Sequence, residues 1–78
     1  MSNLIETSEN INLSIPIIGG KILSIIISEN VTIYNIYDLL RVKYNISGKK
    51  RIDESILFLF ITGLIELNNI KFKVIYED

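Results

Sequence analysis

Asp53 and Glu54 are neighbouring carboxylates, a residue type that can support acid–base catalysis or metal binding. Both fall in a segment with helical periodicity, where consecutive side chains point about 100° apart and do not converge on one ligand. The 78 residues include no histidine and no cysteine, so imidazole catalysis and zinc sites built on these ligands are excluded. The Gly19-Gly20-Lys21 run lacks the spacing of a phosphate-binding loop. We therefore expect a protein without enzymatic activity, metal or cofactor.

Basic residues form the second group with chemical potential, because lysine and arginine can neutralise phosphates. Alternatively, they lie at a solvated helix junction, where Lys49 would pair with Asp53 and Lys50 with Glu54. The net charge of -1 is unlike that of a typical nucleic-acid-binding domain. Asparagine, glutamine and arginine, which read base edges, are missing from the outer side of the neighbouring helix. The candidate nucleic-acid contacts are Lys43, Lys49, Lys50, Arg51, Lys71 and Lys73.

Three large apolar residues share one side of the same segment: Leu57, Phe58 and Ile61. Glu54 lies on this side too, opposite the face of the helix that should be core. We expect these three residues to bind a protein partner. The alternative is that the helix is rotated about its axis relative to this expectation, in which case the three residues belong to the core.

Helical periodicity predicts helices over residues 17–28, 33–44 and 49–62. Pro16 suits the first turn of the first helix, and Thr32 is a candidate N-cap of the second. Gly63 should end the third helix, because glycine adopts the left-handed conformation at little cost. The expected core residues are Ile18, Ile22, Ile25 and Ile26 in the first helix, Ile33, Ile36, Tyr37, Leu40 and Tyr44 in the second, and Ile52, Ile56, Leu59, Phe60 and Gly63 in the third.

Two features of the first helix leave alternatives open. Gly19 and Gly20 weaken it, and either close approach of another backbone or a frayed first turn explains them. Apolar residues also lie outside its expected core face, at Ile17, Leu23 and Ile27. We expect these three to form a second partner-binding patch, occupied either by a second copy of this chain or by a different protein.

Strict alternation of apolar and polar residues predicts a hairpin with strands over residues 64–67 and 70–75. Asn68 and Asn69 would form a type I′ turn, since asparagine tolerates positive φ. That loop places Glu66 opposite Lys71, a favourable cross-strand pair. The packed face would contain Ile65, Leu67, Ile70, Phe72 and Val74.

The order helix, short turn, helix, helix and hairpin is that of a winged helix-turn-helix, a small α+β fold. A one-residue strand at Val31 would fit the same arrangement. We expect one winged-helix domain over residues 15–78, preceded over residues 1–14 by a flexible or partner-ordered arm.

Hydrophobic residues make up 49% of the chain, which is a large share for so small an interior. We expect part of this apolar surface to be covered by another chain; an unusually apolar monomer is the alternative. The apolar stretch over residues 15–27 is too short and interrupted to cross a bilayer. The start of the chain does not resemble a signal peptide, so we expect a cytoplasmic protein.

Two runs resemble a known family: IIGGKIL over residues 17–23 and LFLFITGLIE over residues 57–66. They are similar to the small middle components of ABC-three component systems, which are Lamassu-like prokaryotic anti-phage operons. Thr62 stands where that pattern more often has leucine. The resemblance implies a non-catalytic subunit that bridges an SMC- or Rad50-like ATPase and an effector of the same operon. Separately from the resemblance, the basic residues leave non-specific DNA contact within the complex open. The alternative function is a winged-helix DNA-binding transcriptional regulator, dimeric through its first helix.

Overall fold

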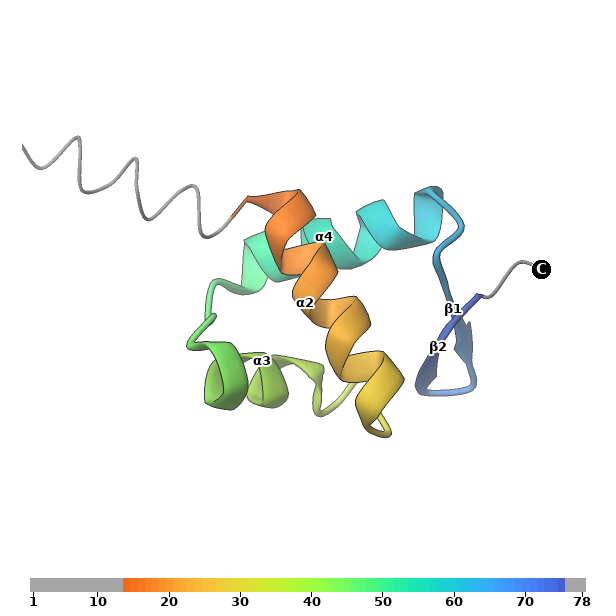
Figure 1. The fold of residues 1–78 in the computed structure, drawn as a ribbon, viewed down its shortest axis with the longest axis horizontal. Helices are drawn as coiled ribbons and strands as arrows, with labels where there is room; N and C mark the ends of the chain where they lie inside the picture. The colour runs from red at the N-terminus through yellow and green to blue at the C-terminus, as the bar shows by residue number, and fades with distance from the viewer. Residues whose placement is uncertain (1–13, 76–78) are drawn as a thin grey trace, which may run out of the picture.

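A computed structural model describes residues 14–75 and shows three helices followed by a two-stranded antiparallel hairpin (Figure 1). The elements are α2 (Ile15–Ser28), α3 (Ile36–Tyr44), α4 (Lys49–Ile61), β1 (Ile65–Asn68) and β2 (Lys71–Val74). This is the winged helix-turn-helix layout expected from the sequence. Residues 1–13 of the expected N-terminal arm lie outside the described residues.

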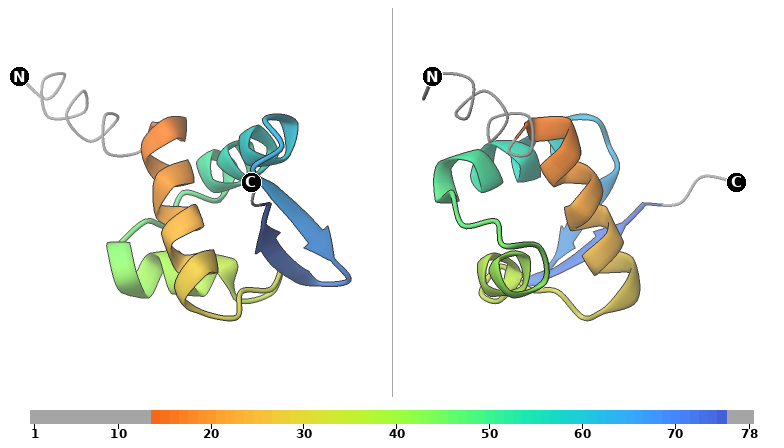
Figure 2. Two further views of the ribbon diagram at one scale, coloured as in Figure 1. Left: turned by 45° about the vertical axis from the view of Figure 1, so that its right-hand side comes forward. Right: turned by 60° about the vertical axis from the view of Figure 1, so that its left-hand side comes forward.

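Helix α2 is the centre of the domain, since it packs against α3, α4 and β2 (Figures 1 and 2). Its first turn contains Pro16 and closes with a bond of 2.9 Å from the Ile18 N–H to the Ser14 carbonyl. The four isoleucines expected in the core are all buried. A methyl group added at Gly19 would lie 3.5 Å from Cδ2 of Leu59, so Gly19 faces a side chain of α4 rather than another backbone.

Thr32 and Asn35 organise the entry to α3 by exchanging hydrogen bonds. The Thr32 N–H donates to Asn35 Oδ1 at 2.7 Å, and the Asn35 N–H donates to Thr32 Oγ1 at 3.2 Å. Thr32 therefore caps as expected, but it caps a turn over residues 33–35, and α3 begins only at Ile36. Ile36 and Leu40 are buried, whereas Ile33 precedes the helix and is exposed, so its expected place in the core was wrong.

The segment between α2 and α3 also pairs with the hairpin, through a single isolated bridge outside the two-stranded sheet. Thr32 forms an isolated antiparallel bridge with Lys71 of β2, one residue after the expected position Val31. Two backbone bonds flank it, from the Phe72 N–H to the Val31 carbonyl at 2.8 Å and from the Ile33 N–H to the Ile70 carbonyl at 2.9 Å. This contact ties the hairpin to the helices.

Helix α4 ends as the glycine predicts. Gly63 has φ +77°, and its N–H donates to the Phe60 carbonyl at 3.0 Å. The Leu64 N–H donates to the Leu59 carbonyl at 2.9 Å, which completes a Schellman motif. Ile52 and Leu59 are buried as expected, together with Ser55, whose hydroxyl donates to the Arg51 carbonyl at 2.8 Å. Gly63 itself is exposed rather than in the core.

The hairpin register differs by two residues from the expected one. The observed pairs are Ile65 with Val74, Glu66 with Lys73, Leu67 with Phe72 and Asn68 with Lys71. Asn69 and Ile70 therefore form the loop, and of these only Asn69 has positive φ, at 61°, which is the φ pattern of a type II′ turn. A slip of two residues keeps each side chain on its face.

The expected packed face of the hairpin is correct only near the helices. Ile65 and Phe72 are buried and Val74 is half-buried, but Leu67 and Ile70, near the hairpin tip, are exposed. No helix within residues 14–75 is both long and apolar enough to cross a membrane.

A candidate protein-binding surface

The outer side of α4 is apolar and open to solvent. Leu57, Phe58 and Ile61 are exposed over 57%, 39% and 74% of their surface, while Ile52 and Leu59 of the same helix are buried. The rotation of the helix expected from the sequence is therefore confirmed. That a partner covers this side remains a prediction.

The three residues differ in their exposure to solvent and in their contacts with α2. Phe58 leans towards α2, because a methyl group at Gly19 would lie 3.9 Å from its Cδ2 atom. Leu57 and Ile61, four residues apart, are neighbours along the helix and are the most exposed of the three. Leu64, directly after the helix stop, is exposed as well and was missed as a surface residue because the hairpin pattern assigned it to a strand.

A groove of about 200 Å³ with a mainly apolar lining lies between α3, α4 and the hairpin. Leu57 lies one turn from Phe60, which lines this groove. Sequence periodicity alone could not reveal the groove, because it forms where three separate elements meet. Its lining residues are Ile33, Ile36, Tyr37, Asp53, Ile56, Phe60, Leu67 and Phe72.

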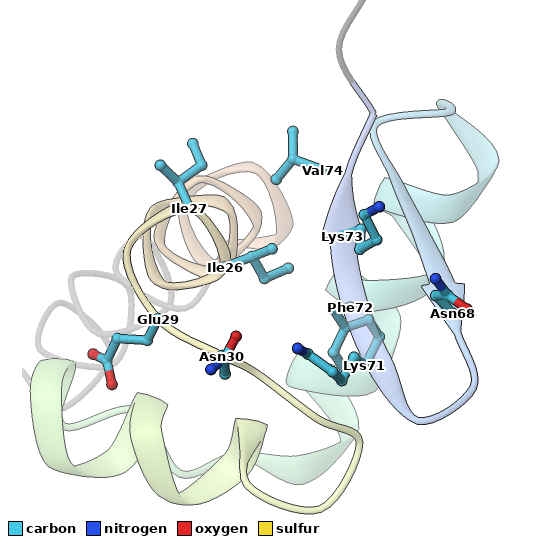
Figure 3. Close-up of a pocket in the computed structure, with 9 residues that line it drawn as sticks. All are labelled: Ile26, Ile27, Glu29, Asn30, Asn68, Lys71, Phe72, Lys73 and Val74. Atoms are coloured by element: carbon cyan, nitrogen blue, oxygen red, sulfur yellow. The ribbon is translucent and has the colours of Figure 1, made fainter.

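The second expected patch is only partly formed. Ile17 and Ile27 are exposed, but Leu23 is half-buried against the core. Leu23 and Ile27 are neighbours four residues apart. Ile17 lies ten residues before Ile27, about 15 Å along the helix, so the three residues do not form one cluster. Ile27 instead borders a groove between the end of α2 and β2 (Figure 3).

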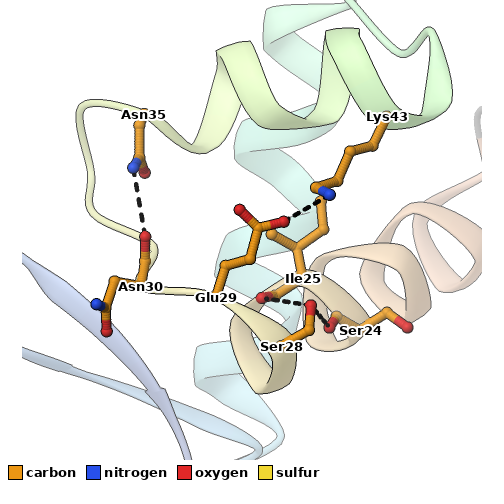
Figure 4. Close-up of polar contacts among 7 residues, drawn as sticks. All are labelled: Ser24, Ile25, Ser28, Glu29, Asn30, Asn35 and Lys43. Carbon is orange, nitrogen blue, oxygen red and sulfur yellow. Dashed lines mark hydrogen bonds and ion pairs between the residues drawn. The ribbon is translucent and has the colours of Figure 1, made fainter.

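The basic cluster around the start of α4 is largely neutralised by carboxylates. Lys43 Nζ lies 2.6 Å from Oε2 of Glu29, a pair that joins α3 to the end of α2 (Figure 4). Glu54 pairs with Arg51 at 3.3 Å rather than with Lys50, which corrects the expected pairing. Within residues 14–75, Lys50 makes no ion pair. Lys50 is therefore better placed than Lys43, Lys49 or Arg51 to meet an external anion.

The expected pair between Lys49 and Asp53 is present at 2.8 Å, and Tyr37 extends it. The Tyr37 hydroxyl donates a hydrogen bond to Oδ1 of Asp53, while Lys49 lies 5.5 Å from the centre of the Tyr37 ring. The hydrogen bonds from Lys49 and Tyr37 lower the pKa of Asp53, and the bond to Asp53 raises the pKa of Lys49. Asp53 is thus a structural anion that links α3 to α4.

On the wing, Lys71 and Lys73 lie on the exposed face of β2. Neither forms an ion pair with another residue of the described range, although Lys73 stands opposite Glu66. In the same range, no three acidic side chains gather in the manner of a metal site.

Comparisons with protein-family models, curated proteins and solved structures found no match.

Proposed function

We propose that this chain is a non-catalytic interaction subunit that binds a larger protein through the outer side of α4. The observation that carries the proposal is the exposure of Leu57, Phe58 and Ile61 on one side of a well-formed helix. Fully burying one such side chain contributes about 1.5–3 kcal/mol, so the three together can anchor an assembly.

The surroundings of these residues support a protein partner over a nucleic acid. Leu57 lies one helical turn from Phe60, which lines an apolar groove, so a partner helix could place its own apolar residues across both. Most basic residues near α4 are bound to carboxylates of this chain and would have to be released before they could meet phosphates.

The identity of the partners comes from the resemblance in the runs over residues 17–23 and 57–66. By analogy with middle components of ABC-three component systems, the partners are an SMC- or Rad50-like ATPase and an effector encoded in the same operon. This chain would hold the two together in a cytoplasmic anti-phage defence complex, and the chemistry would belong to the partners.

Co-expression with the neighbouring genes tests the proposal. A tagged form of this chain should retain the ATPase through affinity purification and elute with it in size-exclusion chromatography. Changing both Leu57 and Ile61 to glutamate should abolish co-elution without changing the circular dichroism spectrum. Separate elution of the wild-type chain from each neighbouring gene product would reject the proposal.

A DNA-binding regulator is the second candidate. It is favoured by the winged-helix fold and by Lys50, Lys71 and Lys73, candidate contacts that make no ion pair with any residue from 14 to 75. Such binding should weaken steeply with salt, because each phosphate contact releases counterions. An electrophoretic mobility shift at low salt that is lost when these lysines become glutamates would support it. No shift at low salt would eliminate it.

A further inference from the structure

One edge of β2 is only half paired. The Ile75 N–H donates to the Leu64 carbonyl at 2.9 Å, so Ile65 and Val74, the next pair of the ladder, occupy a position without hydrogen bonds between them. Hydrogen-bonded and non-bonded pairs alternate in antiparallel strands. The main-chain N–H and C=O groups of Phe72 and Val74 therefore point away from β1, towards the opposite edge.

The segment over residues 31–33 covers only the first part of this edge. Its bonds reach Ile70 and Phe72, and before Val31 the chain leaves the sheet at Asn30 to join α2. In the part of the chain that the structure describes, no backbone segment pairs with Val74 on this side. The edge therefore ends with an unpaired donor and acceptor of a strand.

A groove of about 400 Å³ lies beside this unpaired edge, between β2 and the end of α2 (Figure 3). Its walls combine apolar side chains with polar ones at the rim. Ile26, Ile27, Phe72 and Val74 supply the apolar part, and Asn30, Asn68, Lys71 and Lys73 the polar part.

The groove has a positive balance of charge. Its one lining carboxylate within the described range, Glu29, is engaged by Lys43 at 2.6 Å. Lys71 and Lys73 are exposed and form no ion pair with any residue from 14 to 75. An incoming negative charge would therefore meet two lysines without displacing an internal partner.

We propose that this groove binds an extended acidic segment of a partner protein, which adds a short strand at Val74. The main chain of the segment would pair with the N–H and C=O of Val74. Of its alternating side chains, one set would contact Ile26 and Ile27 and the other would reach Lys71 and Lys73. A peptide suits the site better than a nucleic acid, because an open strand edge and apolar walls match a polypeptide.

This groove shares no residue with Leu57, Phe58 and Ile61, so the inference does not rest on the proposed function. It gives the chain a second binding surface.

Fluorescence anisotropy tests the inference with the full chain and synthetic peptides as probes. A labelled peptide of alternating valine and glutamate should bind at low salt. The same sequence with lysine in place of glutamate, or with methylated backbone nitrogens, should not bind. Changing both Lys71 and Lys73 to glutamate should weaken binding by roughly tenfold or more.

Val74→Pro tests strand addition directly. Proline removes an N–H that points away from β1 and leaves the bonds to β1 intact. We expect binding to weaken about two- to tenfold, the range for one backbone hydrogen bond. Leu67→Pro is the matched control: the Leu67 N–H points to the outer edge of β1, so binding should be unchanged. Circular dichroism should show that both variants are folded. If Val74→Pro does not fold, strand addition is tested instead by comparing the wild-type chain's binding of the glutamate peptide with and without methylated backbone nitrogens.

Four results would overturn the inference. The first is no binding of the glutamate peptide, and the second is equal binding of its backbone-methylated form. The third is binding that appears only after residues 1–13 are removed, which would assign the groove to this chain's own N-terminal segment. Stronger binding of single-stranded DNA, lost in the same double lysine variant, would assign the lysines to nucleic acid instead.

Discussion

The hydroxyl of Tyr37 donates a hydrogen bond to the carboxylate of Asp53 and so joins α3 to α4. The two helices otherwise have few backbone contacts with one another, since each packs mainly against α2. This bond and the ion pair from Lys49 to the same carboxylate therefore help to set the position of α4 and of the apolar side that it presents.

Tyr37→Phe removes this bond and keeps the ring. We expect the free energy of unfolding to fall by about 0.5–1.5 kcal/mol, the usual net contribution of one hydrogen bond. Urea denaturation followed by circular dichroism measures the change. Tyr34→Phe is the control, because the Tyr34 side chain is exposed and its substitution should leave stability unchanged. Equal stability of Tyr37→Phe and the wild type would mean that water replaces the bond without cost.

Asp53 should make stability depend on pH. Its pKa is below the ordinary value of 3.8 because Lys49 and Tyr37 hydrogen-bond to its charged form. A carboxyl whose pKa is lower in the folded state stabilises the protein above the unfolded pKa, and this contribution is lost as the pH falls through the folded pKa. Partial exposure to solvent keeps the effect well below that of a buried pair.

Asp53→Asn should therefore be less stable than the wild type at neutral pH and should lose less stability on acidification to below about pH 4. Urea denaturation at a series of pH values tests this. Asp38→Asn serves as the control, because Asp38 pairs with Arg41 three residues away on an exposed surface. Parallel pH profiles for Asp53→Asn and the wild type would contradict the prediction.

Single charges on the apolar side of α4 should separate binding from folding. Ile61→Glu should remain folded, because the side chain is already in water, and should lose binding to the partner. Val42→Glu is a matched control, since Val42 is 68% exposed on α3, away from the α4 side. Phe58→Glu should also lose binding and stay folded. Because Phe58 lies beside Gly19, this substitution also removes a contact with α2, so Ile61→Glu is the more specific test of binding. Unchanged co-purification of Ile61→Glu would place the interface elsewhere.

Two glycine substitutions should change stability in opposite directions. Gly63→Ala forces a side chain into the left-handed conformation and should cost roughly 1–2 kcal/mol. Gly20→Ala should stabilise by about 0.5–1 kcal/mol, since Gly20 is helical and a methyl group there would meet nothing within 4 Å. Thermal unfolding measures both, and a loss of stability in Gly20→Ala would show a constraint on α2 that the packing does not explain.

Local patterns in the sequence were enough to predict the order of elements, the buried side of α2, the outward side of α4 and the stop at Gly63. Each depends on helical periodicity or on one residue's backbone preference, and both act over a few neighbouring residues. The alternation of side chains between the two faces of the hairpin was predictable for the same reason, whereas the exposure of Leu67 and Ile70 was not.

Only the tertiary structure decided the hairpin register, the partners of Lys43 and Glu54, and the two grooves. A slip of two residues leaves the alternation of apolar and polar side chains unchanged, so this alternation fits both registers. The observed register is the one with the bridge between Thr32 and Lys71 and with the turn at Asn69. Glu29 pairs with Lys43 because α2 and α3 pack together. The distance between these two side chains cannot be predicted from their separation along the chain. The unpaired edge at Val74 likewise exists because the chain turns away at Asn30 before it can cover the rest of β2.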